Sequence, residues 1–231
     1  MIRFSSLLRT ALAAAGLLAL GHGASADVTV TNAGFEAAPI LSAPTKQYVY
    51  DPVTPSSWTY TGNSGLAINI PGAMANTTPF GVIGTAANGN QVAFLQNTMG
   101  IVSTISETVT STAGFFAITF AAEGRNYSAS RINPSPIKVL VDGNVVFNGL
   151  PNADGTFHQI VTNGYAFTAG SHTLLFETTG PSPSSDATTF IDNVGSVLAV
   201  PEPSQFVLAG VAAIGGLGAF YRKRKAAKAS A

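Results

Sequence analysis

Short runs rich in Val, Ile, Thr and Phe fill the chain between Asp27 and Ala199, and clusters of Gly, Asn, Pro and Ser separate them. Such runs are typical of β-strands, and no window in this stretch sustains a long helical period. Strands are predicted at 28–31, 57–61, 66–70, 91–96, 101–109, 115–122, 137–141, 145–148, 157–162, 165–168, 172–178 and 189–194. Strands this short and closely spaced predict an all-β fold in which two sheets pack as a sandwich.

The connections between these strands differ in length. The clearest turn is Asp142-Gly143, because an Asp-Gly pair readily adopts the positive φ angles of a tight hairpin. Three longer segments, 37–56, 71–90 and 180–187, are rich in Pro, Gly, Asn or Ser and are predicted to be loops. Loops on a rigid sheet scaffold often carry binding residues.

The first 26 residues have the features of a secretory signal peptide. Arg3 and Arg9 give a positive start, residues 11–20 are apolar, and Ala24-Ser25-Ala26 offers a small-residue cleavage site. We therefore expect an exported chain that begins at Asp27. The predicted division is a signal peptide at 1–26, one β-sandwich domain at 27–199 and a C-terminal segment at 200–231.

The C-terminal segment contains Pro201-Glu202-Pro203, an uncharged apolar run at 205–221 and a basic cluster. At about 1.5 Å rise per residue, a helix over this run just reaches the shortest length that spans a bilayer. The basic cluster, which the positive-inside rule would keep in the cytoplasm, consists of Arg222, Lys223, Arg224 and Lys225. The segment therefore predicts membrane association with the sandwich outside the cell.

The charge of the chain changes when its ends are set aside. The whole chain has 11 basic and 11 acidic residues, but seven of the basic residues lie in the two terminal segments. The sandwich keeps four basic residues against ten acidic ones, a net charge of −6. A negative domain is unsuited to binding phosphate backbones, so nucleic acid is excluded as a partner. The absence of cysteine excludes a thiol nucleophile.

Pro201-Glu202-Pro203, the apolar run and the basic cluster at the end of the chain together resemble the PEP-CTERM sorting domain of Gram-negative bacteria that make exopolysaccharide. The resemblance covers residues 200–231. It implies that an exosortase, a membrane cysteine transpeptidase, processes the chain near Pro201-Glu202-Pro203, and that the product reaches the cell surface or an extracellular, biofilm-type matrix. An ordinary C-terminal anchor helix is the alternative.

A second resemblance concerns the sandwich. The segment from Asn32 to Glu36, then Trp58, then residues 170–176 and 190–194 follow one another as in galactose-binding-like jelly rolls, which include carbohydrate-binding modules. The resemblance implies a jelly roll whose first and last strands hold a structural calcium ion, with Glu36 and Asp192 as carboxylate ligands; no other cofactor is required. Calcium prefers six to eight oxygen ligands. The alternative is that both residues cap turns.

Sugar binding, which the second resemblance also implies, needs an exposed aromatic face and polar partners for the hydroxyl groups. Trp58 and Tyr60 are candidates on one face of a predicted strand, and Arg125 and Tyr127 form a polar and aromatic group at a strand end. The alternative for Trp58 is a place in the core, where large aromatic residues usually lie.

Enzymatic motifs are absent from the sequence. There is no Gly-x-Ser-x-Gly or His-Glu-x-x-His, and both His158 and His172 fit predicted strands. Asp142 and Asp154 would have to meet in space to act as a glycosidase pair. The sequence thus favours a non-catalytic, exported surface protein that binds polysaccharide. The alternatives are a structural or adhesive protein that acts through protein contacts, and a glycan hydrolase.

Overall fold

The computed structural model describes residues 27–37, 48–52, 57–68, 84–98, 101–128, 131–179 and 187–200. The predicted signal peptide, the Pro-Glu-Pro motif, the apolar run and the basic cluster lie outside these ranges. Within the described ranges, no helical segment has the length and hydropathy needed to cross a bilayer. The predicted domain boundaries therefore stay predictions.

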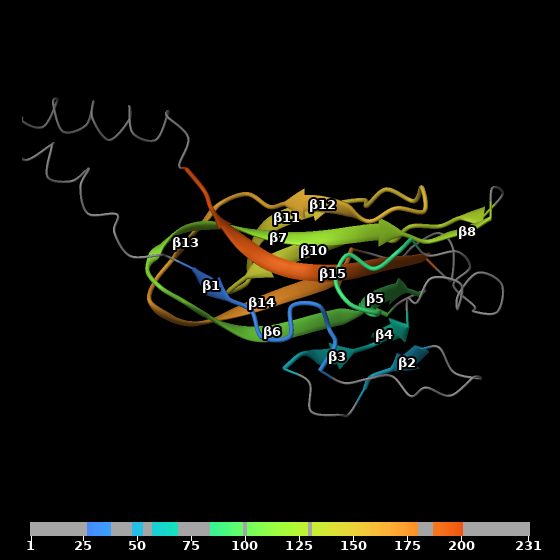
Figure 1. Cartoon of the computed structure of the whole chain (residues 1–231), viewed down its shortest axis with the longest axis horizontal. Coiled ribbons are helices and arrows are strands. Elements are labelled where there is room, and N and C mark those ends of the chain that lie inside the picture. The colour runs from blue at the N-terminus through green and yellow to red at the C-terminus, as the bar shows by residue number, and fades with distance from the viewer. Residues whose placement is uncertain are drawn as a thin grey trace, which may run out of the picture.

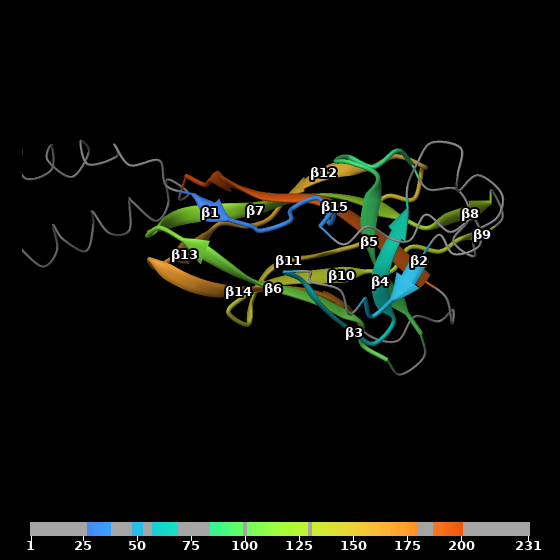
Figure 2. The same ribbon diagram turned by 60° about the horizontal axis from the view of Figure 1, so that its bottom comes forward.

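Two antiparallel sheets form the sandwich, as the sequence predicted (Figures 1 and 2). Sheet A has the order β1-β6-β14-β10-β11, with β3 also paired to β6. Its strands are β1 (Val28–Thr29), β3 (Thr59–Thr61), β6 (Thr104–Ser111), β10 (Ile137–Val141), β11 (Asn144–Gly149) and β14 (Gly170–Thr178).

Sheet B has the order β12-β7-β15-β5-β4-β2, with β13 also paired to β7. Its strands are β2 (Tyr48–Tyr50), β4 (Ser64–Ile68), β5 (Gln91–Asn97), β7 (Gly114–Gly124), β12 (His158–Val161), β13 (Tyr165–Phe167) and β15 (Ala187–Leu198). A separate ribbon pairs β8 (Asn126–Ser128) with β9 (Arg131–Ile132). Figure 2 shows β7 and β15 in one layer above β6 and β14 in the other.

Some boundaries differ from the predicted ones. Strand β2 lies in a segment predicted to be a loop, and β8 and β9 were not predicted. Strand β1 ends at Thr29 because the chain turns at 31–37, where Asn32 and Phe35 have positive φ angles. Strand β15 runs on to Leu198 through an irregularity between Asp192 and Gly195, where Asn193 has a positive φ angle.

Aromatic side chains fill the space between the sheets. Phe120 of β7 meets Phe176 of β14 edge to face, with ring centroids 5.3 Å apart, and both rings are fully buried. Strand β5 behaves differently from the strands of sheet A: all of its 7 residues are buried, so both faces of sheet B are covered at this point. Its outward side chains therefore do not face open solvent.

Candidate binding face on sheet B

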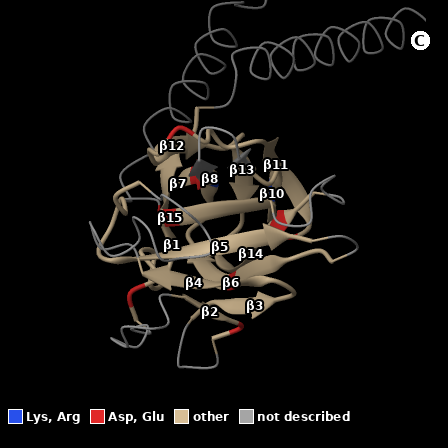
Figure 3. Cartoon of the chain, turned by 90° about the vertical axis from the view of Figure 1, so that its right-hand side faces the viewer, with Lys and Arg blue, Asp and Glu red and all other residues tan. Residues whose placement is uncertain are grey.

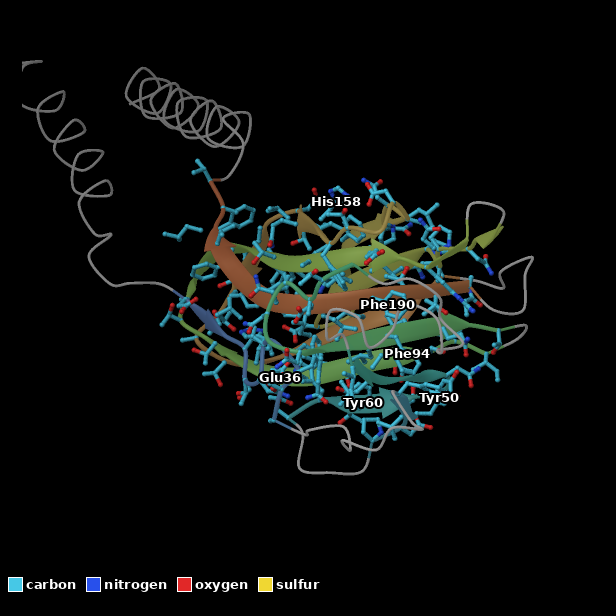
Figure 4. All side chains as sticks on the ribbon, turned by 45° about the vertical axis from the view of Figure 1, so that its right-hand side comes forward. Glu36, Tyr50, Tyr60, Phe94, His158 and Phe190 are labelled. Carbon is cyan, nitrogen blue, oxygen red and sulfur yellow. The ribbon has the colours of Figure 1, made fainter. Side chains whose placement is uncertain are left out.

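The outward face of sheet B carries an apolar cluster that is separate from the main core. Phe190 of β15 lies opposite Phe94 of β5, and both rings are 0% exposed. The cluster is completed by buried Ala67 and Val92 and by partly buried Tyr48, Ala86 and Phe157. Figure 4 shows Phe94 and Phe190 on neighbouring strands, with His158 toward one edge of the sheet and Tyr50 toward the other. Buried aromatic side chains thus lie in the middle of this face.

Polar side chains form a second row on the same face. Thr188 of β15 lies opposite Gln96 of β5, and its carbonyl oxygen accepts a hydrogen bond from the backbone of Arg125 on the other side. All three residues are buried. Tyr50 of β2 extends the row, because its hydroxyl donates to Gln96 Oε1 at 2.8 Å. Side chains two residues apart on a strand share a face, so this row lies beside the two phenylalanines.

Glu123 links the two rows. It is the cross-strand partner of Phe190, two residues before Arg125, and is 0% exposed. Its Oε2 accepts a hydrogen bond from the Gly84 N–H at 2.7 Å. Burial raises the pKa of Glu123 to about 7, with a smaller increase from the Asp154 carboxylate; the Gly84 N–H and His158 oppose the rise. The Glu123 side chain therefore changes between its protonated and ionised forms near neutral pH.

Two buried oxygen atoms on this face have no hydrogen-bond partner within the described part of the chain. They are Glu123 Oε1 and the Thr188 hydroxyl. Burying a polar atom without a hydrogen bond typically costs about 1–3 kcal/mol. Such atoms are suited to receive or donate hydrogen bonds to a bound molecule.

At the edge of the face, Asp154 accepts a hydrogen bond from His158 Nε2 at 2.8 Å, and both side chains are exposed. The other aspartate of the hypothetical glycosidase pair, Asp142, contacts His172 at the β10–β11 turn. Each aspartate is thus engaged with its own histidine. Figure 3 shows the acidic residues of the described strands and turns at scattered positions, without one acidic patch.

Glu36 and Asp192 come together around the segment that precedes β5. Glu36 Oε1 accepts the N–H groups of Asn90 and Gln91 at 2.8 and 2.6 Å. Asp192 Oδ2 accepts the Asn88 N–H at 2.7 Å, and its Oδ1 accepts the N–H of Asn193. Burial raises the pKa of Asp192 to about 6, and the Glu36 carboxylate adds to the rise.

These bonds are those expected of turn caps. No group of three or more His, Cys, Asp and Glu side chains that could hold a metal occurs among the described residues. Two carboxylates alone supply fewer oxygen atoms than calcium requires, so backbone carbonyl groups would have to complete the set. Calcium binding by Glu36 and Asp192 stays a prediction.

The structure corrects the expected role of two aromatic residues. Trp58 and Tyr60 are only 3% and 8% exposed and belong to the core between the sheets. The Trp58 ring packs against Phe35, and its Nε1 donates to the Asn32 carbonyl oxygen at 3.1 Å. Neither ring offers a free face to a sugar. Their shared strand face was predicted correctly, but it points inward.

The backbone of Arg125 continues β7 beside Thr188, so alternation puts Arg125 on the same face as Glu123, whereas the side chain of Tyr127 is outside the described residues. Sequence reasoning missed Thr188, Gln96, Tyr50, Phe94 and Phe190 as members of a common face. The signal was the pattern Val92-x-Phe94-x-Gln96, whose alternate residues share a face, but buried residues on both faces of β5 hid it.

The chain is therefore a two-sheet antiparallel β-sandwich with a buried polar and aromatic face on one sheet. No protein-family model matches the chain, and no curated protein matches it. It is similar to the solved structure of TmCBM61 in complex with β-1,4-galactotriose, with 14% identity and a TM-score of 0.48, over 74% of this chain and 97% of the other.

Two further similarities have the same character. The carbohydrate-binding module CBM35 from Paenibacillus barcinonensis is 15% identical, with a TM-score of 0.39, over 62% of this chain and 94% of the other. The arabinose-bound MgGH51 α-L-arabinofuranosidase is 11% identical, with a TM-score of 0.44, over 76% of this chain but only 27% of the other. Because these TM-scores are below 0.5, the assignment of the fold is based on the strand pairing of this chain alone.

Proposed function

We propose that the protein is a non-catalytic, exported surface protein that binds a polysaccharide on the outward face of sheet B. The observation that carries the proposal is the pair of buried, unpartnered oxygen atoms, Glu123 Oε1 and the Thr188 hydroxyl, beside an aromatic cluster within the described strands. This proposal moves the expected sugar site away from Trp58 and Tyr60 and keeps Arg125.

A saccharide matches this combination of groups. Each sugar hydroxyl both donates and accepts hydrogen bonds, so one hydroxyl would donate to Glu123 Oε1 while another would bond to the Thr188 hydroxyl. Hydrogen bonds to a charged group contribute about 1.5–3 kcal/mol. Phe94 and Phe190 are fully buried, so the residues that cover them must move before the apolar face of a pyranose ring can pack on this cluster. Ligand sites usually combine apolar surface with a few polar groups.

The C-terminal segment is the basis for the cell-surface part of the proposal. An exosortase-type enzyme would recognise Pro201-Glu202-Pro203 while residues 205–221 lie in the membrane and the basic cluster 222–225 stays in the cytoplasm. The order of these three parts supports a processing signal. A permanent anchor helix is the competing outcome.

A glycan array probed with the full chain in mild detergent tests the binding function. Selective binding supports the proposal, and Thr188→Val should reduce it at least tenfold, because this change removes a hydroxyl and keeps the shape. Thr188→Val should not destabilise the fold, since the hydroxyl lacks a partner in the described chain. Thr108→Val, at an exposed position of β6 in sheet A, is the matched control and should bind normally.

An array with no bound glycan would overturn the binding function and favour a structural or adhesive protein. Release of reducing ends from a bound polysaccharide would instead identify a hydrolase and overturn the non-catalytic assignment.

A further inference from the structure

Residues 84–90, here called the strap, cross the outward face of sheet B before the chain enters β5 (Figure 1). At one end of the strap, Gly84 lies against Gly155 and Glu123. Ala86 packs on the apolar cluster that contains Phe94 and Phe190. The strap thus covers part of the proposed binding face.

Three carboxylates hold the strap, and they come from three separate parts of the chain. Glu123 of β7 accepts the N–H of Gly84, Asp192 of β15 accepts the N–H of Asn88, and Glu36 accepts the N–H of Asn90. All of these bonds go to backbone groups of the strap. Substituting the strap side chains would therefore leave the bonds in place, whereas substituting the carboxylates would not.

Little apolar burial adds to these bonds. Thr85 and residues 87–90 are exposed, and Ala86 is only partly buried. A segment with few buried apolar contacts can open locally at a small free-energy cost while the rest of the fold stays intact. Within the described ranges, the carboxylates are therefore the polar side chains whose bonds would separate a closed strap from an open one.

We propose that the strap is a movable cover, and that its opening exposes Glu123 and the aromatic cluster to a polysaccharide. This inference rests on the proposed function for the identity of the ligand, but the movement of the strap can be measured without any ligand.

The direction of the pH dependence follows from the ionisation of Glu123. Its pKa is about 7 with the strap closed, mainly because of burial, and would return toward 4.5 in water when the strap opens. The closed strap is therefore favoured below pH 4.5 and loses this advantage as the pH rises through 7. The ratio of closed to open strap would change by at most roughly 300-fold over this range.

Other charged groups near the strap modify this effect. Asp154 faces Glu123 and raises its pKa, whereas His158 of β12 lowers it, and Arg125 is two residues further along the chain. At the other end, Asp192 has a pKa raised to about 6 by burial, and Glu36 faces it. Because Glu36 and Asp192 are the candidate calcium ligands, the pH dependence of closure is assigned to Glu123 alone.

Amide hydrogen exchange of the full chain tests the inference. The protection factor of the Gly84 amide, which already corrects for the intrinsic pH dependence of exchange, should fall at least tenfold between pH 5 and pH 8. Glu123→Gln keeps an oxygen acceptor but does not ionise, so this fall should shrink. Glu177→Gln, in an ion pair with Lys138 on sheet A, is the matched control and should leave the fall unchanged. A protection factor that is constant or rises with pH would overturn the inference.

Gly84→Ala separates the strap from the binding function. A Cβ atom at Gly84 would lie 2.6 Å from the Gly155 carbonyl oxygen and 2.9 Å from Glu123 Oε2, so it should displace the strap. The Gly84→Ala chain should show low strap protection at both pH values and, on the glycan array, stronger binding than the unaltered chain. If protection depends on pH but the array shows no bound glycan, the movement of the strap is supported and glycan binding is rejected. Two outcomes would overturn the proposal that the strap covers the binding face. One is normal strap protection in the Gly84→Ala chain, and the other is unchanged glycan binding in a Gly84→Ala chain whose strap protection is low.

Discussion

Asp142 and His172 join the β10–β11 turn to the first residues of β14. His172 Nδ1 lies 2.6 Å from Asp142 Oδ2, and His172 Nε2 lies 2.9 Å from the carbonyl oxygen of Thr168. Both partners are acceptors, so the doubly protonated ring satisfies both. The carboxylate of Asp142 also accepts the Thr173 N–H. This pair therefore fixes a hairpin turn, which agrees with the interpretation of His172 as a framework residue.

Stability should depend on the charge of His172. The hydrogen bonds to Asp142 and Thr168 raise the pKa of His172, so its contribution is complete below pH 6.5 and is lost as the pH rises through the higher folded-state pKa. His172→Gln should lower the free energy of unfolding at pH 6 by about 1–2 kcal/mol, because Asp142 is 36% exposed and solvent weakens the pair. Urea denaturation at pH 6 and pH 9 measures both effects. An equal loss at both pH values would contradict the prediction.

Trp58→Ala should lower the free energy of unfolding by about 3–5 kcal/mol, because the ring is buried among Phe35 and Phe176. Circular dichroism is the suitable probe, since Trp58 is the one tryptophan of the chain. Trp58→Phe should remain folded and keep its glycan binding. A loss of binding in a folded Trp58→Phe chain would restore the sugar-stacking role.

Gly65→Ala should weaken the edge of sheet B. A Cβ atom at Gly65 would collide with the Val49 carbonyl oxygen and lie 2.9 Å from the Phe94 ring. The expected result is loss of β2 pairing, seen as faster exchange of the β2 amides, with a destabilisation of about 1–3 kcal/mol. Gly143→Ala is a useful comparison, because its Cβ would meet no atom within 4 Å and only the φ angle of 78° opposes it.

A structural calcium ion held by Glu36 and Asp192 should stabilise the fold. Millimolar calcium should raise the melting temperature of the full chain, a chelator should reverse the rise, and Asp192→Asn should abolish it. Identical melting curves with calcium and with chelator would leave Glu36 and Asp192 as caps of the strap.

The sorting proposal predicts the mass of the mature protein. Mass spectrometry of surface material should find no peptide from 222–225. When Pro201-Glu202-Pro203 is replaced with alanines, residues 222–225 should stay attached to the chain. Peptides from the basic cluster on the unaltered mature protein would restore the permanent anchor.

Much of the fold could be predicted because each strand of a sandwich carries its own signal. Alternation in β6 and β10, and Asp142-Gly143 between β10 and β11, are local patterns, and the predicted ranges overlap the observed strands. Strand β2 escaped prediction because Tyr48–Tyr50 is short and lies in a proline-rich segment.

The candidate site was harder to predict because it depends on register. Glu123, Phe190 and Phe94 are far apart in sequence and meet only because β15 pairs with both β7 and β5. Period-two alternation placed Trp58 and Tyr60 on one face, but it could not say which face met the other sheet. Arg125 was proposed from the local cluster of polar residues around it, and its role in sugar binding stays a prediction.

Strand β15 pairs with β5 through Ala187–Ile191 and with β7 as far as Leu198, and the described chain ends two residues later at Val200. A C-terminus held at a cell surface would therefore pull along the axis of a strand that is paired with β7 near its C-terminal end and with β5 in its N-terminal part. Its ladder hydrogen bonds would be loaded in shear, many at once, instead of opening one after another as at a sheet edge. In the proposed surface protein, β15 would therefore carry tension between the cell surface and a bound polysaccharide through its ladder of hydrogen bonds.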